Sequence, residues 1–131
     1  MNVFFSAEAP KVIGPYAQAI QTGSLLYCSG QTPLDPITMK IEVSDIEGQT
    51  LRVIKNLEMV LGSAGLKLSD VVKTNVFLTD MNLFAPMNAV YAELFGDHRP
   101  ARSTVAVKGL PYGALVEIEC IAEFITRETT N

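Results

Sequence analysis

Short apolar runs separated by turn residues fill the first third of the chain. After a first run at residues 3–5, residues 17–21 and 25–29 flank the turn signal Thr22-Gly23-Ser24. Two such runs around a glycine-containing turn predict a β-hairpin. The tripeptide Ser29-Gly30-Gln31 closes the second run, and glycine lets a backbone turn sharply or be approached closely. We expect this tripeptide to be either the wall of a binding site or a simple turn.

The segment at residues 45–64 has the spacing of an amphipathic helix. Apolar residues recur there every three or four positions with charged residues between them, which is the pattern of a helix with one buried face. Ser44 followed three residues later by Glu47 fits a capping box, and Gly65 is well placed to end the helix. We expect this helix to serve packing and not chemistry.

A second helix is predicted over residues 82–95. Asn82 is placed to cap it, and Pro86 falls within its first turn, where a missing backbone amide costs least. Asn88 lies on or beside the apolar face, so its amide needs hydrogen-bond partners. Those partners are either groups of a neighbouring loop or a ligand.

Three β-type runs complete the pattern, at residues 71–78, 102–107 and 115–124. The last two are joined by a connection that contains glycine and proline, which suits an antiparallel return. The expected order of elements is therefore β-β-β-α-β-α-β-β. Such a series predicts one α+β domain over residues 1–131, with both helices on one face of the sheet. The opposite face is then free to form the core of an oligomer.

Arg102 and two acidic residues of the last run are the candidate chemistry. Apolar side chains alternate there with Glu117 and Glu119, so both carboxylates point away from the buried side. A guanidinium binds a carboxylate with two parallel hydrogen bonds. If Arg102 shares a sheet surface with the glutamates, it is placed to hold a small organic acid beside them. The plain alternatives are a solvated arginine or a cross-strand ion pair.

The composition favours an oligomer in the cytoplasm, without a nucleic-acid or membrane partner. Apolar residues make up 48% of the 131 residues and charged residues only 18%, so we expect an interface to bury part of the apolar surface. The net charge is −4 and the basic residues are scattered, which does not favour nucleic acid. No apolar run approaches the ~20 residues of a membrane span, and residues 1–11 lack the features of an export signal.

The cysteine and histidine residues predict neither a metal centre nor a disulfide. Cys28 and Cys120 lie in strand-like apolar runs, which suits buried reduced thiols. His98 is the single histidine and lies in a polar loop, so we expect it to be solvated. Metal and nucleotide sites are not predicted, because no CxxC, HExxH or glycine-rich phosphate motif occurs.

Seven short motifs follow one another along the chain. They are Ile13-Gly14-Pro15-Tyr16, Ser29-Gly30-Gln31, Ala64-Gly65-Leu66, Val72-Lys73-Thr74 with Val76-Phe77-Leu78, Met87-Asn88-Ala89-Val90-Tyr91, Pro100-Ala101-Arg102-Ser103 and Val116-Glu117-Ile118-Glu119-Cys120-Ile121-Ala122. Together they resemble the Rid family, formerly called YjgF, of reactive intermediate deaminases. The resemblance covers nearly the whole chain. It implies a chorismate-mutase-like α+β fold with a mixed sheet, assembled as a homotrimer whose three clefts are each lined by two subunits.

The resemblance also implies roles for individual residues. Arg102 matches the arginine that holds the substrate carboxylate, and Glu117 matches the acid that positions or activates the attacking water. The other positions that match the family's pocket are Tyr16, Gly30, Asn88 and Thr104. The last of these is a cysteine in many members. If that position contributes through its backbone amide, a threonine serves equally well.

The implied function is hydrolysis of enamine and imine intermediates, 2-iminopropanoate and 2-iminobutanoate, to 2-keto acids and ammonia. No metal or organic cofactor is required, because Arg102 orients the substrate and Glu117 takes a proton from water. The alternative is a non-catalytic trimer that binds 2-keto acids for regulation. The two functions differ at Glu117, since a binder needs no base there.

Overall fold

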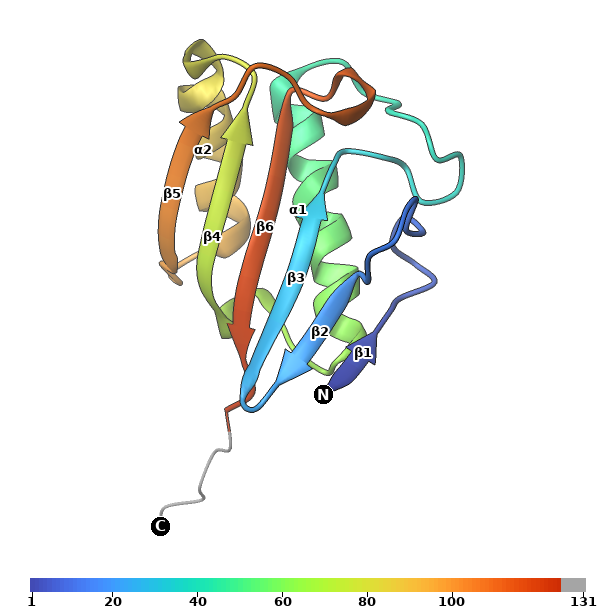
Figure 1. Cartoon of the computed structure of the whole chain (residues 1–131). Coiled ribbons are helices and arrows are strands. Elements are labelled where there is room, and N and C mark those ends of the chain that lie inside the picture. The colour runs from blue at the N-terminus through green and yellow to red at the C-terminus, as the bar shows by residue number, and fades with distance from the viewer. Residues whose placement is uncertain (126–131) are drawn as a thin grey trace.

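The computed structural model describes residues 1–125, which form one six-stranded sheet with two helices against one face (Figure 1). Residues 126–131 of the predicted domain lie outside the described part. The predicted order of strands and helices is confirmed. In chain order the elements are β1 (Asn2–Phe4), β2 (Ala19–Thr22), β3 (Leu25–Gln31), α1 (Ile46–Ser63), β4 (Val71–Leu78), α2 (Phe84–Phe95), β5 (Ala101–Ala106) and β6 (Val116–Glu123).

The sheet is mixed, with the spatial order β1-β2-β3-β6-β4-β5. All neighbouring strands are antiparallel except β4 and β5, which are parallel. The predicted hairpin of β2 and β3 is confirmed, and Gly23 at its turn has a φ of 57°, a conformation that glycine adopts without strain.

The last two strands run antiparallel to each other, as predicted, but they do not pair as a hairpin. β5 pairs with β4 alone, and β6 lies between β3 and β4. Parallel neighbours need a crossover connection, and α2 supplies it between β4 and β5. The connection that leaves β5 therefore passes the end of β4 to reach β6 on its other side, as the upper part of Figure 1 shows.

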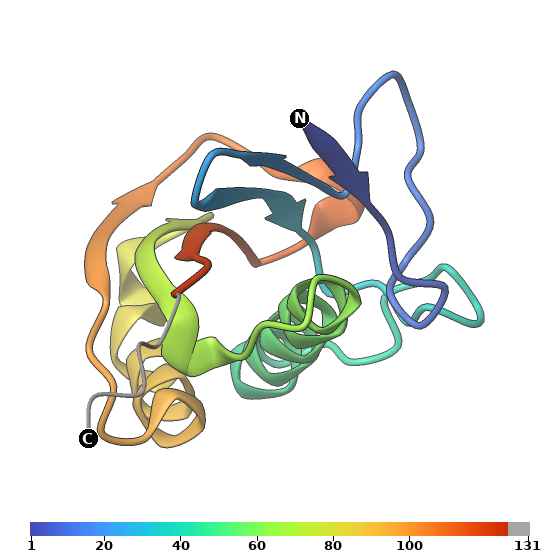
Figure 2. The same cartoon turned by 90° about the horizontal axis from the view of Figure 1, so that it is seen from below.

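Both helices pack against the same face of the sheet, and the other face carries no helix (Figure 2). β6 alternates buried and half-buried residues along its whole length, which confirms the predicted alternation. No helix among residues 1–125 is long and apolar enough to cross a membrane. The fully buried side chains of α1 that form the core with the sheet are Val53, Ile54, Leu57, Val60 and Leu61.

Both predicted N-terminal helix caps differ from the observed ones, whereas α1 ends at Ser63 with Gly65 just beyond it at a φ of 75°, as predicted. The capping box of Ser44 and Glu47 does not form, because α1 begins after Asp45, which makes no side-chain capping hydrogen bond. Asn82 does not cap α2. Its backbone amide instead donates to Asp80 Oδ1 at 2.7 Å, in a short turn that precedes the helix. The residue that caps each helix therefore depends on the path of the loop before it. The spacing of residue types along the sequence does not specify that path.

Asn56, a buried polar side chain of α1, fixes the loop that follows β3. Its Nδ2 donates to the carbonyl oxygens of Thr32, at 3.1 Å, and Leu34, at 3.0 Å. Gln49 of the same helix accepts a hydrogen bond from the backbone amide of Leu115 at 2.8 Å, just before β6. The helix predicted to serve packing thus also positions two segments beside the cavity described below.

The cysteine and histidine predictions had different outcomes. Cys28 and Cys120 are paired across β3 and β6, and both are buried and free, as predicted. Their mutual hydrogen bond and burial raise the pKa of the Cys120 thiol. His98 is not solvated, because it is half-buried and its Nε2 lies 2.6 Å from the carbonyl oxygen of Val71. The local sequence around His98 does not predict this contact, because Val71 lies 27 residues earlier in the chain.

Candidate functional site

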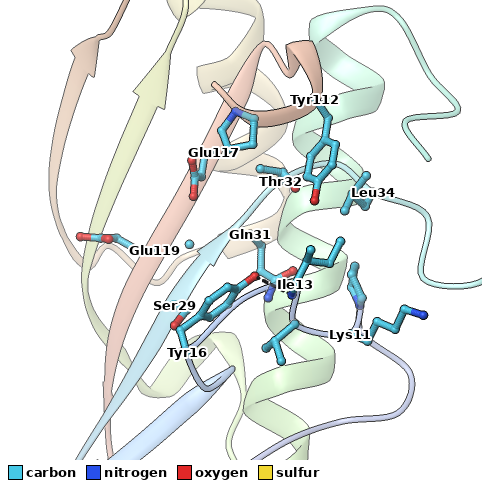
Figure 3. A pocket seen from close by; sticks show the side chains of 14 residues that line it. Lys11, Ile13, Tyr16, Ser29, Gln31, Thr32, Leu34, Tyr112, Glu117 and Glu119 are labelled. Atoms are coloured by element: carbon cyan, nitrogen blue, oxygen red, sulfur yellow. Dashed lines mark hydrogen bonds between the residues drawn. The ribbon is translucent and has the colours of Figure 1, made fainter. Parts of the chain in front are cut away.

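A cavity of about 430 Å³ lies where the end of β3 meets the start of β6 (Figure 3). Its lining combines the segment before β2, the end of β3 with the loop that follows, the turn before β6, and β6 itself. The predicted site tripeptide Ser29-Gly30-Gln31 lines this cavity. Its other polar and aromatic side chains include Tyr16, Tyr112, Glu117 and Glu119.

Gly30 makes room for the carboxylate of Glu117. The pairing of β3 with β6 is irregular between Cys28 and Gln31, so this stretch leaves the regular ladder. A Cβ atom placed on Gly30 would lie only 2.3 Å from Glu117 Oε2 and 3.0 Å from its Cδ. The missing side chain at position 30 is therefore what allows the carboxylate to lie over the strand.

The environment of Glu117 favours its protonated form. Burial raises the pKa of the Glu117 carboxyl, because a half-buried carboxylate loses part of its hydration, and the nearby charge of Glu119 raises it further. Glu119 accepts a hydrogen bond from Asn75 Nδ2 at 2.9 Å. Within residues 1–125 neither glutamate has an ion-pair partner. A carboxyl with a raised pKa is suited to take up and return a proton.

Tyr16 is held at the edge of this cavity by the turn that precedes it. Gly14 has a φ of 132°, and the backbone amide of Tyr16 donates to the Gly14 carbonyl at 3.0 Å. The Tyr16 hydroxyl in turn accepts a long hydrogen bond, 3.4 Å, from the backbone amide of Ile13. The ring remains half-exposed, so it is oriented by its own turn and available to a ligand.

Arg102 lies in a second cluster, on the helix side of β5. Its Nη1 donates to Asn88 Oδ1 at 2.7 Å. Its guanidinium carbon lies 4.7 Å from the ring centroid of Tyr91 and 5.5 Å from that of Phe84, so two cation–π contacts orient the group. No carboxylate of residues 1–125 pairs with it. The solvated arginine and the cross-strand ion pair are therefore both excluded for this part of the chain.

Three hydroxyl groups accompany this arginine, those of Tyr91, Thr74 and Thr104. Tyr91 and Thr74 share a buried hydrogen bond of 2.8 Å between their hydroxyl oxygens, which fixes the ring under the guanidinium. Thr104 is the next residue of β5 on the same face as Arg102. Its hydroxyl oxygen is buried and has no hydrogen-bond partner among the described residues. A buried hydroxyl without a partner is costly, and a bound ligand or a second chain would satisfy it.

The condition that Arg102 shares a sheet surface with the glutamates is not met within one copy of the chain. Arg102 pairs with Thr74 of β4, whose side chain is buried against α2, whereas Glu119 pairs with the next residue, Asn75. Paired residues of neighbouring strands point to the same face, and successive residues point to opposite faces. Arg102 and the two glutamates therefore face opposite sides of the sheet. One small molecule cannot touch both groups of a single copy.

Sequence reasoning missed three aromatic roles. Phe84 was not singled out from the sequence, and Tyr91 was named only within a motif, yet both rings contact the Arg102 guanidinium. Their spacing of four and three residues from Asn88 places all three on one helical face, a signal that could have revealed the cluster. Nothing in the sequence around Tyr112 indicated a role for it. The position of its ring in the cavity depends on a positive φ that the neighbouring residues do not predict.

Fold and site together define a small α+β protein with an anchored arginine on one face of its sheet and an acidic cavity on the other. The family model described as endoribonuclease L-PSP matches residues 6–124. A RutC family protein of Pyrococcus horikoshii is 52% identical over 121 residues, which cover 92% of this chain and 96% of that protein.

Solved structures agree with this relationship. YyfA from Yersinia pestis, a protein of the conserved Rid family, has 47% identity and a TM-score of 0.90, with 93% of this chain and 98% of that chain covered. E. coli TdcF with bound serine has 38% identity and a TM-score of 0.90, with 94% and 98% covered. The chain belongs to the Rid/YjgF family, and the expected YjgF-like fold is confirmed.

Proposed function

We propose that this protein hydrolyses 2-imino acids, such as 2-iminopropanoate and 2-iminobutanoate, to 2-keto acids and ammonia. Membership of a family linked to imine deamination supports the reaction class. The observation that carries the proposal is the state of Arg102: its guanidinium is oriented by Asn88 and two aromatic rings, yet no carboxylate of the described residues occupies it. TdcF, of the same fold, binds serine, a small molecule with one carboxylate.

The complete site requires two copies of the chain. Arg102 and Glu117 face opposite sides of one sheet, so an imine held by the arginine of one copy meets the glutamate of another. A closed ring of copies would bring each arginine to the next cavity, and the homotrimer implied by the resemblance is such a ring. The sheet face without helices, which exposes Tyr27 and Val72, would lie at the centre of this assembly.

The reaction needs orientation and one proton-transfer group. Arg102 holds the carboxylate, which places the C=N carbon beside a water molecule at Glu117. The carboxylate of Glu117 takes a proton as the water oxygen bonds to that carbon, and the carbinolamine forms. Return of that proton to nitrogen lets the C–N bond break and ammonia leave. As the C=O bond of the 2-keto acid forms, the carbinolamine hydroxyl gives its proton to the regenerated Glu117 carboxylate, which releases it to solvent. The raised pKa of Glu117 favours this return.

The test is a coupled assay in which a serine or threonine dehydratase generates the imine and the appearance of keto acid is followed. We expect Arg102→Ala to abolish the acceleration while the protein remains folded. Glu117→Gln is expected to bind 2-ketobutyrate and lose turnover. A wild-type protein that binds 2-ketobutyrate without accelerating hydrolysis would instead be the regulatory binder.

Mixing the two inactive variants tests the shared site directly. If each site takes Arg102 from one copy and Glu117 from another, equal amounts of Arg102→Ala and Glu117→Gln chains refolded together should recover about a quarter of the wild-type activity, since one random pairing in four restores both groups. Each variant refolded alone is the control. No recovery in mixed oligomers would mean that both residues act within one copy or that the assembly differs.

A further inference from the structure

Tyr112 has a backbone conformation that is costly for its residue type. It lies in the turn Pro111–Gly113 before β6, with φ 62° and ψ 17°. Among residues 1–125 the only other non-glycine residue with positive φ is Met39. A bulky side chain in the left-handed region is unusual, and residues held in this way cluster where function requires them. Glycine or asparagine would be the ordinary residue at such a position.

This conformation places the Tyr112 ring against the cavity. Figure 3 shows the ring beside Leu34 and Thr32, with its hydroxyl turned toward the cavity, across from Glu117. The side chain is 56% exposed, and its hydroxyl makes no hydrogen bond within residues 1–125. Neither burial nor hydrogen bonding of the side chain therefore compensates for the backbone cost. Burial and hydrogen bonding thus give no reason of stability for a tyrosine at position 112.

The cavity has an acidic end and a second end where apolar side chains lie beside the Tyr112 ring and Thr32. Glu117 and Glu119 line the first end, while Tyr112 faces Leu34 and Ile13 at the second (Figure 3). An imino acid whose reacting carbon lies at Glu117 has its carboxylate on Arg102 of a second copy. In such a pose, the end of the cavity at Tyr112 is the space left for its side chain.

We propose that Tyr112 is a specificity-determining residue, whose ring forms the wall against which an apolar substrate side chain longer than two carbons packs. This inference rests on the proposed function and names the substrate class of the same site. 2-Imino acids with branched or aromatic side chains would gain contact with the ring, whereas 2-iminopropanoate is too short to reach it. The strained backbone conformation of Tyr112 is then what places its ring at this wall of the cavity.

The experiment compares kcat/KM for 2-imino acids that an L-amino-acid oxidase generates from alanine and from leucine. Tyr112→Asn removes the ring and suits the left-handed backbone. It should lower kcat/KM for the leucine-derived imine about tenfold relative to the alanine-derived one, mainly through KM, while the melting temperature rises or stays equal. Tyr112→Phe keeps the ring and should keep the wild-type ratio. Met39→Asn is the matched control, because it replaces the other non-glycine residue of residues 1–125 with a positive φ, which does not line this cavity.

The outcomes separate this inference from the function on which it rests. A ratio in Tyr112→Asn within twofold of the wild-type value, with both imines still hydrolysed, would overturn the role of Tyr112 alone. An equal fall in the ratio for Met39→Asn would also overturn it, since the effect would then come from strain and not from the ring. No hydrolysis of either imine by the wild-type protein would overturn the proposed function and this inference with it.

Discussion

Replacing Gly30 by alanine tests whether the exact position of the Glu117 carboxylate matters. The new Cβ would lie 2.3 Å from Glu117 Oε2, where ordinary contact begins near 3.4 Å, so the carboxylate must retreat by about 1 Å. A misplacement of about 1 Å in a reacting group can cost roughly a hundredfold in rate. We therefore expect kcat to fall about a hundredfold, which corresponds to about 2.7 kcal/mol in activation free energy.

The stability of the same variant should change little. The group that moves is the end of a flexible side chain, and Gly30 does not have a positive φ. Alanine also reduces the entropy of the unfolded chain by an amount equivalent to about 0.4–1 kcal/mol. The free energy of unfolding in urea should therefore stay within about 1 kcal/mol of the wild-type value, while the dehydratase-coupled assay shows the loss in rate.

Gly62→Ala is the matched control for this substitution. Gly62 lies in α1, and a Cβ there would have no neighbour within 4 Å. The change should stabilise the fold by about 0.5–1 kcal/mol through helix propensity and leave kcat unchanged. If Gly30→Ala retains kcat within threefold of wild type, the position of the Glu117 carboxylate is not critical and its role as proton acceptor is refuted.

Three further predictions concern the pH dependence of activity, the stability of a Glu117 variant and the ring contact of Arg102. Activity should fall as the pH drops through the raised pKa of Glu117. Glu119→Gln removes a neighbouring negative charge and should move this acid limb of the kcat/KM profile to lower pH. An acid limb that does not move would show that the charge of Glu119 does not raise the pKa of Glu117. Because the folded state binds the Glu117 proton more tightly than the unfolded state, Glu117→Gln should stabilise the fold at neutral pH, with the gain vanishing in acid. Tyr91→Leu removes a cation–π contact worth about 0.5–2 kcal/mol, so KM for 2-imino acids should rise roughly 2- to 30-fold. Tyr91→Phe keeps that contact and should lower only stability in urea, because Thr74 loses its hydrogen-bond partner; an equal rise in KM for both variants would exclude the ring contact.

Local patterns were enough to predict the elements of this fold. Two-residue alternation identified β6 and placed Glu117 and Glu119 together on one side of it, and helical spacing located α1 and α2 to within a few residues. These predictions succeed because side-chain direction repeats with a fixed period inside one element. The motif resemblance extended them to a fold and a set of site residues. The predictions of the two N-terminal helix caps failed, because each cap depends on the path of the preceding loop.

Arg102 and Glu117 show what only the tertiary structure decided. The sequence by itself determined that one is a strand-entry arginine and the other an acid on the polar side of a strand. It could not determine that β4 lies between β5 and β6, nor that Arg102 pairs with the buried Thr74. The physical reason is that alternation defines the two sides of each strand, but only the pairing register decides which side of one strand joins which side of the next. That register puts the two groups on opposite faces, which is why the proposed site takes one group from each of two copies.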